Sequence, residues 1–242
     1  MPPTAVQVTG LSKHYRLRHT RSLKESIVWA VQGRSRRDQF NALEDLSFSV
    51  GVGESVALLG RNGSGKSTLL KIIAGVMAPD TGSVWVRGRI AGLLEVGAGL
   101  HPDLTGRENV FLNASILGMA PREISRRFDD IVEFADIGPF LDTQVRFYSS
   151  GMFLRLAFAV AVHTDPDIFL VDEILAVGDE PFRRKCLARI RELTDEGRTL
   201  VVVSHDHGLV DQLCTRAILL RGGRIAADGP VREAVAAMDS GR

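Results

Sequence analysis

The sequence contains little cysteine and almost no net charge. Cys186 and Cys214 are the only cysteines among 242 residues, and neither has a second cysteine or a histidine at the spacing of a metal-ligand set. This argues against a disulfide framework and predicts two buried, inert thiols in a reducing compartment. The 30 basic and 29 acidic residues leave a formal charge of +1, so no overall field attracts the protein to nucleic acid.

Long apolar runs are also missing. No uninterrupted stretch approaches the roughly 18 residues that a membrane-spanning helix needs, and the N-terminal MPPTAVQVTGLSKHY lacks the apolar region of a signal peptide. We therefore expect a cytosolic chain that does not itself cross a membrane. With 45% hydrophobic residues, it can form one large domain, which we place at residues 1–242.

Short apolar runs alternate with helical patterns along the chain, which is typical of an α/β sheet. The first buried strand is predicted at SVALL, residues 55–59. GRNGSGKS follows at 60–67, and an apolar helical pattern then continues to Gly75. A strand, a glycine loop and a helix in this order are the setting in which a loop binds phosphate.

The residue types in this loop match its predicted chemistry. Backbone N–H groups can surround a phosphate only where side chains are absent, which explains the glycines. Lys66 adds a positive charge against the outer phosphates, and Ser67 offers a hydroxyl to Mg²⁺. The residues expected at the nucleotide phosphates are Gly60, Asn62, Gly63, Ser64, Gly65, Lys66, Ser67 and Thr68.

Two further apolar runs end in chemically useful residues. The predicted strand at 168–171 is followed by Asp172, expected to hold Mg²⁺ through water, and by Glu173, expected to align the attacking water. The strand at 200–203 is followed by Ser204-His205-Asp206, and a histidine placed after this third strand can reach a γ-phosphate. Together with the glycine loop, these residues predict a site that hydrolyses a nucleoside triphosphate.

A second serine-glycine turn, YSSGM at 148–152, opens an apolar helix. A helix N-terminus of this kind is an anion site. The glycine loop leaves no room for this turn to hold the same nucleotide from the same side. We therefore expect Ser149, Ser150 and Gly151 to contact the nucleotide of a second molecule.

In this order, the glycine loop, the serine-glycine turn, Asp172-Glu173 and His205 resemble the ATP-binding subunits of ABC transporters, and the resemblance covers nearly the whole chain. It implies an ABC ATPase of the P-loop NTPase fold, with a RecA-like core, an antiparallel β region and a helical subdomain at about 97–165. It also implies ATP and Mg²⁺ as cofactors and a homodimer that sandwiches two ATPs. Tyr15 matches the aromatic that stacks on adenine, and Asp179 matches a loop between subunits.

Several departures from the general pattern form a set. YSSGM replaces LSGGQ, AVGD is followed by Phe182, Lys185 and Cys186, and GAGLHPDLTGRENV contains no glutamine where one is usual. Glu95, just before that stretch, is the candidate Mg²⁺ neighbour. These features are similar to exporters of lipid-linked polysaccharides: O-antigen, capsule, teichoic acid and galactan. The sequence does not distinguish these glycans.

This subgroup implies several partners. We expect two copies of a transmembrane permease, a second copy of the chain, the glycan lipid reached through the permease, and a peripheral position at the cytoplasmic face of the membrane. Some relatives carry a C-terminal carbohydrate-binding domain, which we do not expect here. Nucleic acid is not an expected partner.

A basic insert at about 16–41 is the most unusual segment. Residues 1–40 carry eight Lys or Arg against two acidic residues. A capping pattern at 22–25 and apolar residues at helical spacing predict a short amphipathic helix at about 23–31. Because basic residues favour an anionic leaflet, we expect this helix at the permease or the lipid headgroups.

Two other function classes remain open. An ABC-type ATPase could act on another transported substrate or on nucleic acid, although the chain has one glycine loop and no sustained heptad repeat. A small-molecule kinase would account for the glycine loop but not for YSSGM or His205.

Overall fold

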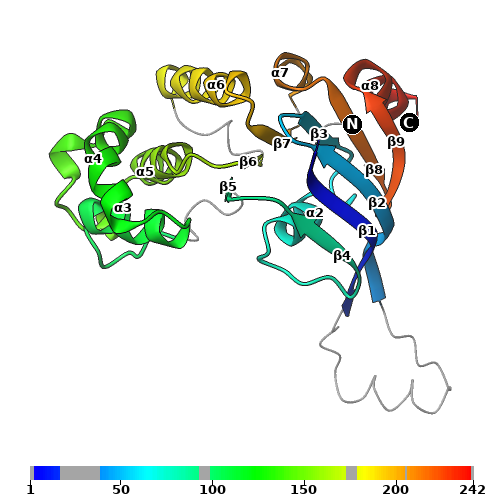
Figure 1. The fold of residues 1–242 in the computed structure, drawn as a ribbon, viewed down its shortest axis with the longest axis horizontal. Coiled ribbons are helices and arrows are strands. Elements are labelled where there is room, and N and C mark those ends of the chain that lie inside the picture. Colours follow the sequence, from blue (N-terminus) through cyan, green and yellow to red (C-terminus); the bar gives the residue numbers. More distant parts are fainter. Residues whose placement is uncertain (1–2, 17–38, 93–98, 173–178, 205, 241–242) are drawn as a thin grey trace, which may run out of the picture.

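The computed structural model describes residues 3–16, 39–92, 99–172, 179–204 and 206–240. Two sheets and several helices make up this part of the chain (Figure 1). No helix among these residues has both the length and the apolar character needed to cross a membrane.

The larger sheet has six strands in the order β5-β6-β7-β3-β8-β9. Its first five strands are parallel, and β9 pairs with β8 in the antiparallel direction. The strands are β3 (Ser55–Leu59), β5 (Ile90–Gly92), β6 (Ile168–Val171), β7 (Thr199–Val203), β8 (Arg216–Arg221) and β9 (Arg224–Pro230). The buried runs predicted at 55–59, 168–171 and 200–203 are therefore three strands of one sheet, with β7 between β6 and β3.

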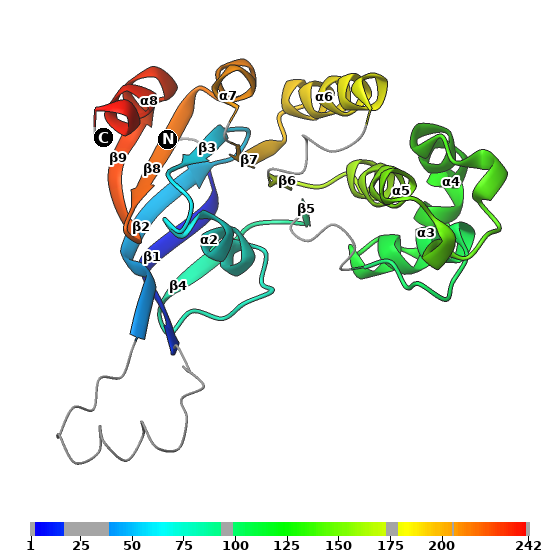
Figure 2. The same cartoon turned by 180° about the vertical axis from the view of Figure 1, so that it is seen from behind.

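The smaller sheet is antiparallel and has the order β2-β1-β4. Its strands are β1 (Thr4–Arg16), β2 (Gln39–Gly51) and β4 (Thr81–Val86). The long hairpin of β1 and β2 projects beyond the rest of the described chain (Figures 1 and 2). The predicted antiparallel region is confirmed.

Helices cover both faces of the larger sheet. Alternate strand residues point to opposite faces; one set packs with α2 (Lys66–Ile73) and the smaller sheet. The other set packs with α6 (Glu180–Asp195), α7 (His207–Leu213) and α8 (Val231–Asp239). The chain thus forms two apolar layers, one on each side of the larger sheet.

Three further helices lie together beyond β5 and β6 (Figures 1 and 2): α3 (Gly106–Ile116), α4 (Pro121–Ala135) and α5 (Ser150–His163). Two 3₁₀ turns, η1 (Gly138–Phe140) and η2 (Val145–Phe147), connect α4 to α5. Thr105 caps α3 in a capping box with Glu108, Gly118 follows at φ 88°, and Pro121 begins α4. A capping box, a glycine just past the end and a proline in the first turn are common boundary residues of helices.

The insert is predicted at about 16–41, but β1 continues to Arg16 and β2 already begins at Gln39. Arg16 pairs with Gln39, Tyr15 with Phe40 and His14 with Asn41. Positions 39–41 therefore belong to β2, because they complete the hydrogen-bonded register of the hairpin. The helix predicted at about 23–31 lies outside the described residues.

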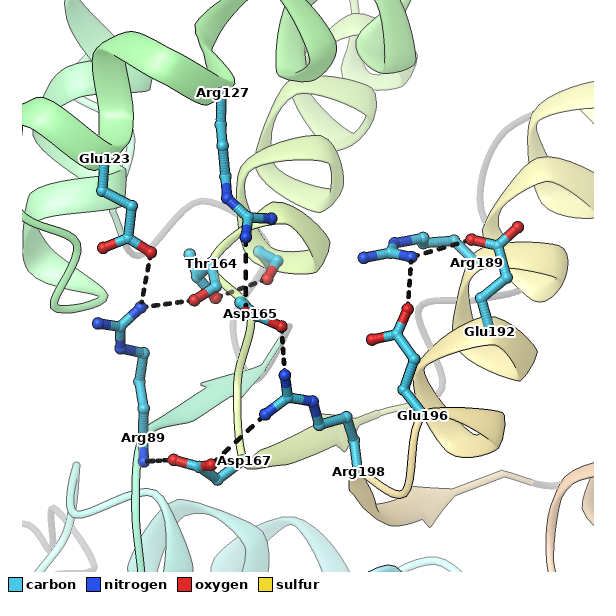
Figure 3. Close-up of polar contacts among 11 residues, drawn as sticks. Arg89, Glu123, Arg127, Thr164, Asp165, Asp167, Arg189, Glu192, Glu196 and Arg198 are labelled. Atoms are coloured by element: carbon cyan, nitrogen blue, oxygen red, sulfur yellow. Dashed lines mark hydrogen bonds and ion pairs between the residues drawn. The ribbon is translucent and has the colours of Figure 1, made fainter.

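A polar cluster joins the helical region to the sheet at the start of β5, β6 and β7 (Figure 3). This junction network consists of Arg89, Glu123, Arg127, Asp165, Asp167 and Arg198. Arg198 lies between Asp165 and Asp167, at 2.6 and 3.5 Å. Arg89 donates from its side chain to the Thr164 carbonyl at 2.6 Å and from its backbone to Asp167 at 2.7 Å. The connection from α5 to β6 is thereby tied to the helical region and to the strands of the larger sheet.

Candidate nucleotide site

The glycine loop at the end of β3 has a backbone that only glycine adopts easily. Gly60, Gly63 and Gly65 have φ of 142°, 79° and 106°. A Cβ on Gly60 would lie 2.4 Å from the Leu220 carbonyl oxygen, and one on Gly65 would lie 2.5 Å from the Ala42 carbonyl oxygen. Backbone conformation and close packing therefore both require glycine at these two positions.

The polar groups inside the loop suit an anion. Lys66 begins α2 and is only 6% exposed, and its Nζ donates to the Gly60 carbonyl at 2.8 Å and the Arg61 carbonyl at 3.3 Å. Ser64 Oγ is buried and has no hydrogen-bond partner among the described residues. Buried polar atoms normally have partners, and a phosphate oxygen would supply one for Ser64 Oγ. Ser67 is exposed and Thr68 half-buried on the first turn of α2, and Asn62 is exposed.

The acidic end of β6 reaches the same sheet edge as this loop. Val171 pairs with Val202, and Ala57 pairs with Val202 on the other side. Asp172 is thus level with the last residues of β3 before Gly60. The two positions are two strands apart, or about 10 Å across the sheet. Asp172 is half-buried. Glu173, His205 and Glu95 lie outside the described residues.

The serine-glycine turn is placed elsewhere. Ser149 is the N-cap of α5, where its Oγ accepts from the Met152 N–H at 3.2 Å, and both Ser149 and Ser150 are exposed. Gly151 is half-buried in the first turn. Figures 1 and 2 show α5 in the helical region, with β5 and β6 between it and α2. The turn and the glycine loop do not converge within one chain.

Asp179 caps α6 and is bound to the helix of the serine-glycine turn. Its carboxylate accepts from the Phe182 N–H at 3.0 Å and from Arg155 at 2.7 Å. Arg155, on α5, also donates to Asp136 at 2.9 Å and lies 5.0 Å from the centre of the Phe182 ring. The sequence places these residues in separate motifs, whereas the fold brings them together.

Tyr15 lies near the end of β1, and its hydroxyl donates to Met77 Sδ at 3.2 Å. Asp80 holds this part of the strand: it accepts from the His14 N–H at 2.6 Å and from Lys13 Nζ at 3.0 Å. The His14 N–H, and next the Lys13 ammonium, lower the pKa of the Asp80 carboxyl. Sequence reasoning missed Asp80, because its role follows from the pairing of β1 with β4.

Comparison with known proteins supplies the family. The sequence profile of the family described as "ABC transporter" matches residues 43–176. The chain belongs to the ABC transporter family. Its matched part runs from β2 through the glycine loop, the helical region and β6.

Similar ABC proteins cover most of the chain. An "ABC transporter protein AbcA" of Aeromonas salmonicida is 45% identical over 97% of this chain and 76% of its own length. An "O-antigen export system ATP-binding protein RfbB" of Myxococcus xanthus is 46% identical over 90% of this chain. A "Teichoic acids export ATP-binding protein TagH" of Listeria monocytogenes is 42% identical over 94% of this chain and 68% of its own length. The chain spans half of the Myxococcus relative.

Solved ABC structures share the fold. The ATP-binding subunit of an ABC transporter superposes with a TM-score of 0.75 at 25% identity, over 95% of this chain and 91% of its own. A dimeric ATP-binding cassette bound to ADP and phosphate has the same TM-score at 24% identity, over 94% of this chain and 99% of its own. The predicted ABC ATPase fold is confirmed.

Proposed function

We propose that this chain is the ATP-binding and ATP-hydrolysing subunit of an ABC exporter that drives a separate membrane subunit to move a lipid-linked polysaccharide. The observation that carries the proposal is its similarity, over nine tenths or more of its length, to ATP-binding proteins named for O-antigen and teichoic acid export. Which glycan is moved stays open, because the relatives are named for different ones.

The glycine loop is the proposed ATP phosphate site. ATP supplies the bond whose hydrolysis powers transport. Backbone N–H groups of the loop and the N-terminus of α2 would face the phosphates, and Lys66 would exchange loop carbonyls for phosphate oxygens. Gly60, Asn62, Gly63, Ser64, Gly65, Ser67 and Thr68 complete this set, and Tyr15 would stack on the adenine.

The remaining residues are assigned to hydrolysis. Mg²⁺ would be held by the Ser67 hydroxyl and, through water, by the Asp172 carboxylate, with Glu95 as a further neighbour. Glu173 would align the attacking water, and His205 would contact the γ-phosphate. A carboxylate at the end of β6 and a histidine after β7 fit these roles, since parallel strands end at one edge of the sheet.

A second copy of the chain would complete each site. The exposed positions of Ser149 and Ser150, remote from the glycine loop of the same chain, support their contact with a partner's ATP. We propose a homodimer at the cytoplasmic face of the membrane, bound to two permease subunits. The basic insert at about 16–41 would contact the permease or lipid headgroups, and Asp179 would lie between the two copies.

The assignment is tested by two substitutions. Glu173→Gln should retain ATP binding, lose turnover and accumulate an ATP-bound dimer, whereas Lys66→Ala should weaken binding itself. Nucleotide affinity, phosphate release and size-exclusion chromatography measure the three properties. Near-normal ATPase activity in Glu173→Gln would contradict the assignment of this residue.

The partner class needs a separate experiment. The chain, affinity-purified from solubilised membranes, should retain a multi-span membrane protein and no RNA, and the Lys66→Ala variant should fail to support glycan export in cells. Recovery of RNA in place of a membrane protein would favour the alternative, an ABC-type ATPase that acts on nucleic acid.

A further inference from the structure

Phe40 is an exposed aromatic residue at the start of β2. Its exposed fraction is 45%, although large apolar side chains in this sheet are mostly buried. Phe40 is the register partner of Tyr15 on β1. Residues directly opposite each other in an antiparallel pair project from the same face. The two rings therefore lie on one face of the hairpin, and the Tyr15 hydroxyl points to Met77.

The same strand, β2, also reaches the glycine loop. Ala42 and Leu43 contact the loop, because a Cβ on Gly65 would lie 2.5 Å from the Ala42 carbonyl oxygen and 2.6 Å from Leu43 Cδ2. Phe40 lies two to three residues further along the strand, which corresponds to about 7–10 Å. A ribose can bridge this spacing between bound phosphates and a base.

Asp80 fixes the position of the aromatic pair through hydrogen bonds to β1. Asp80 follows the loop after α2 and holds the backbone N–H of His14 at 2.6 Å, while its own N–H donates to the Ser12 carbonyl at 3.0 Å. The strand around Tyr15 is thus attached to the segment that connects α2 to β4. Through its pairing with Tyr15, Phe40 acquires a defined place relative to that helix.

We propose that Phe40 is a second base-binding residue, which contacts the purine of the nucleotide beside Tyr15; this rests on the proposed ATP-binding function. Contact between an aromatic ring and a base depends on the π-face of the base and is tolerant of its exocyclic groups. Phe40 therefore contributes affinity for a nucleoside triphosphate over a bare triphosphate and distinguishes ATP from GTP only weakly.

The test compares nucleotides with and without a base. Dissociation constants for ATP, GTP and inorganic tripolyphosphate are measured by calorimetry with Mg²⁺ for the full chain and for Phe40→Ala, Phe40→Trp and Trp85→Ala. Trp85 is a matched control, because it is 53% exposed on β4 and pairs with Gln7, eight residues before Tyr15, or about 26 Å along β1. Circular dichroism and thermal unfolding verify that each variant is folded.

Phe40→Ala should weaken ATP and GTP about five- to tenfold, as expected for loss of one stacking contact, and leave tripolyphosphate unchanged. Phe40→Trp should restore the ATP affinity, and Trp85→Ala should leave all three constants unchanged. Equal ATP affinity in Phe40→Ala and the wild type would overturn the proposal, as would equal weakening of ATP and tripolyphosphate. If the wild-type chain does not bind ATP, or Lys66→Ala binds it normally, the proposed function fails instead.

Discussion

Arg155 connects three parts of the molecule through one guanidinium group. It lies on the helix that begins at the serine-glycine turn, donates to Asp136 and Asp179, and stacks on Phe182 at the start of α6. Its side chain is 19% exposed, but the two carboxylates are 78% and 54% exposed. Solvent therefore screens both ion pairs. The main contribution of Arg155 is to hold Asp136, Asp179 and Phe182 in fixed relative positions.

The first residue-scale prediction concerns this connection. Arg155→Ala should lower the free energy of unfolding by about 1–2 kcal/mol, since two exposed ion pairs and one cation–π contact are lost. ATPase activity should fall further than stability explains, because Asp179 loses its link to the serine turn. Urea unfolding and steady-state hydrolysis measure the two effects.

Arg184 is the control for Arg155. It lies on α6, its side chain is 72% exposed, and it forms an i,i+4 pair with Glu180 at 3.8 Å. Arg184→Ala should change the unfolding free energy by less than about 0.5 kcal/mol and leave hydrolysis intact. The same loss of ATPase activity in both variants would contradict a specific role for Arg155.

At the scale of elements, the critical connection is the segment between α5 and β6. Asp165 has a φ of 52°, which is unusual for a residue with a side chain. Arg127 from α4 and Arg198 from the start of β7 both bind its carboxylate (Figure 3). Arg89 holds the preceding Thr164 carbonyl. The helical region is therefore fastened to the sheet by arginines from three different elements.

Removal of one arginine should reveal how much this attachment stabilises the fold. Arg89→Ala should lower the unfolding free energy by about 2–3 kcal/mol, because a charge-assisted bond to the Thr164 carbonyl is lost in a segment with little exposure. Urea titration by circular dichroism measures the change. Arg122→Ala, an exposed site on α4, is the matched control and should be neutral; equal stability of the two variants would contradict this role.

The elements differ in how well the sequence predicts them. β3 and β6 are continuous buried runs, so their limits at 55–59 and 168–171 agree with the prediction. Caps at Thr105 and Ser149 likewise fix the starts of α3 and α5. β1 has register shifts along both of its partners, which disrupt alternation, and β5 has only three residues. No local pattern identifies such strands.

The residues of the candidate site also differ in how well the sequence predicts them. Lys66 and the glycines belong to one contiguous motif, and they lie together in the loop as predicted. Asp80 and Phe40 belong to no motif, since their positions depend on pairings between distant strands. Roles that follow from chain neighbours are readable from sequence, whereas roles that follow from register require the fold.

For the whole molecule, the two thiols report on global unfolding. Cys186 and Cys214 are buried in the layer formed by α6, α7 and the sheet. Burial raises the pKa of each thiol from 9.0 to about 12. A raised acid pKa means that the folded state disfavours the thiolate, so stability is complete below pH 9 and declines as pH rises from 9 towards 12.

This sign gives a pH prediction. Between pH 9 and 10.5 the unfolding free energy of the wild type should fall faster than that of Cys186→Ala/Cys214→Ala, by up to about 1.4 kcal/mol per pH unit for each thiol. Urea midpoints across this range measure the difference in slope, which is unaffected by any constant loss of packing. Native thiols should also resist a disulfide reagent at pH 8 and react fully in urea. Parallel pH profiles would show that the thiols are not buried as described.

The pairing of Arg16 with Gln39 has an evolutionary consequence. The residues on either side of positions 17–38 are neighbours in one hairpin, so the two ends of that stretch are already held together by strand hydrogen bonds. A doubling of its length should cost only about 0.6 kcal/mol in loop-closure entropy. Insertions, deletions and exchanges at this point are therefore nearly neutral for folding, and selection there can act on the segment's contacts alone. A change of length or sequence at this point of the hairpin therefore needs no compensating change in the packed layers on either side of the larger sheet.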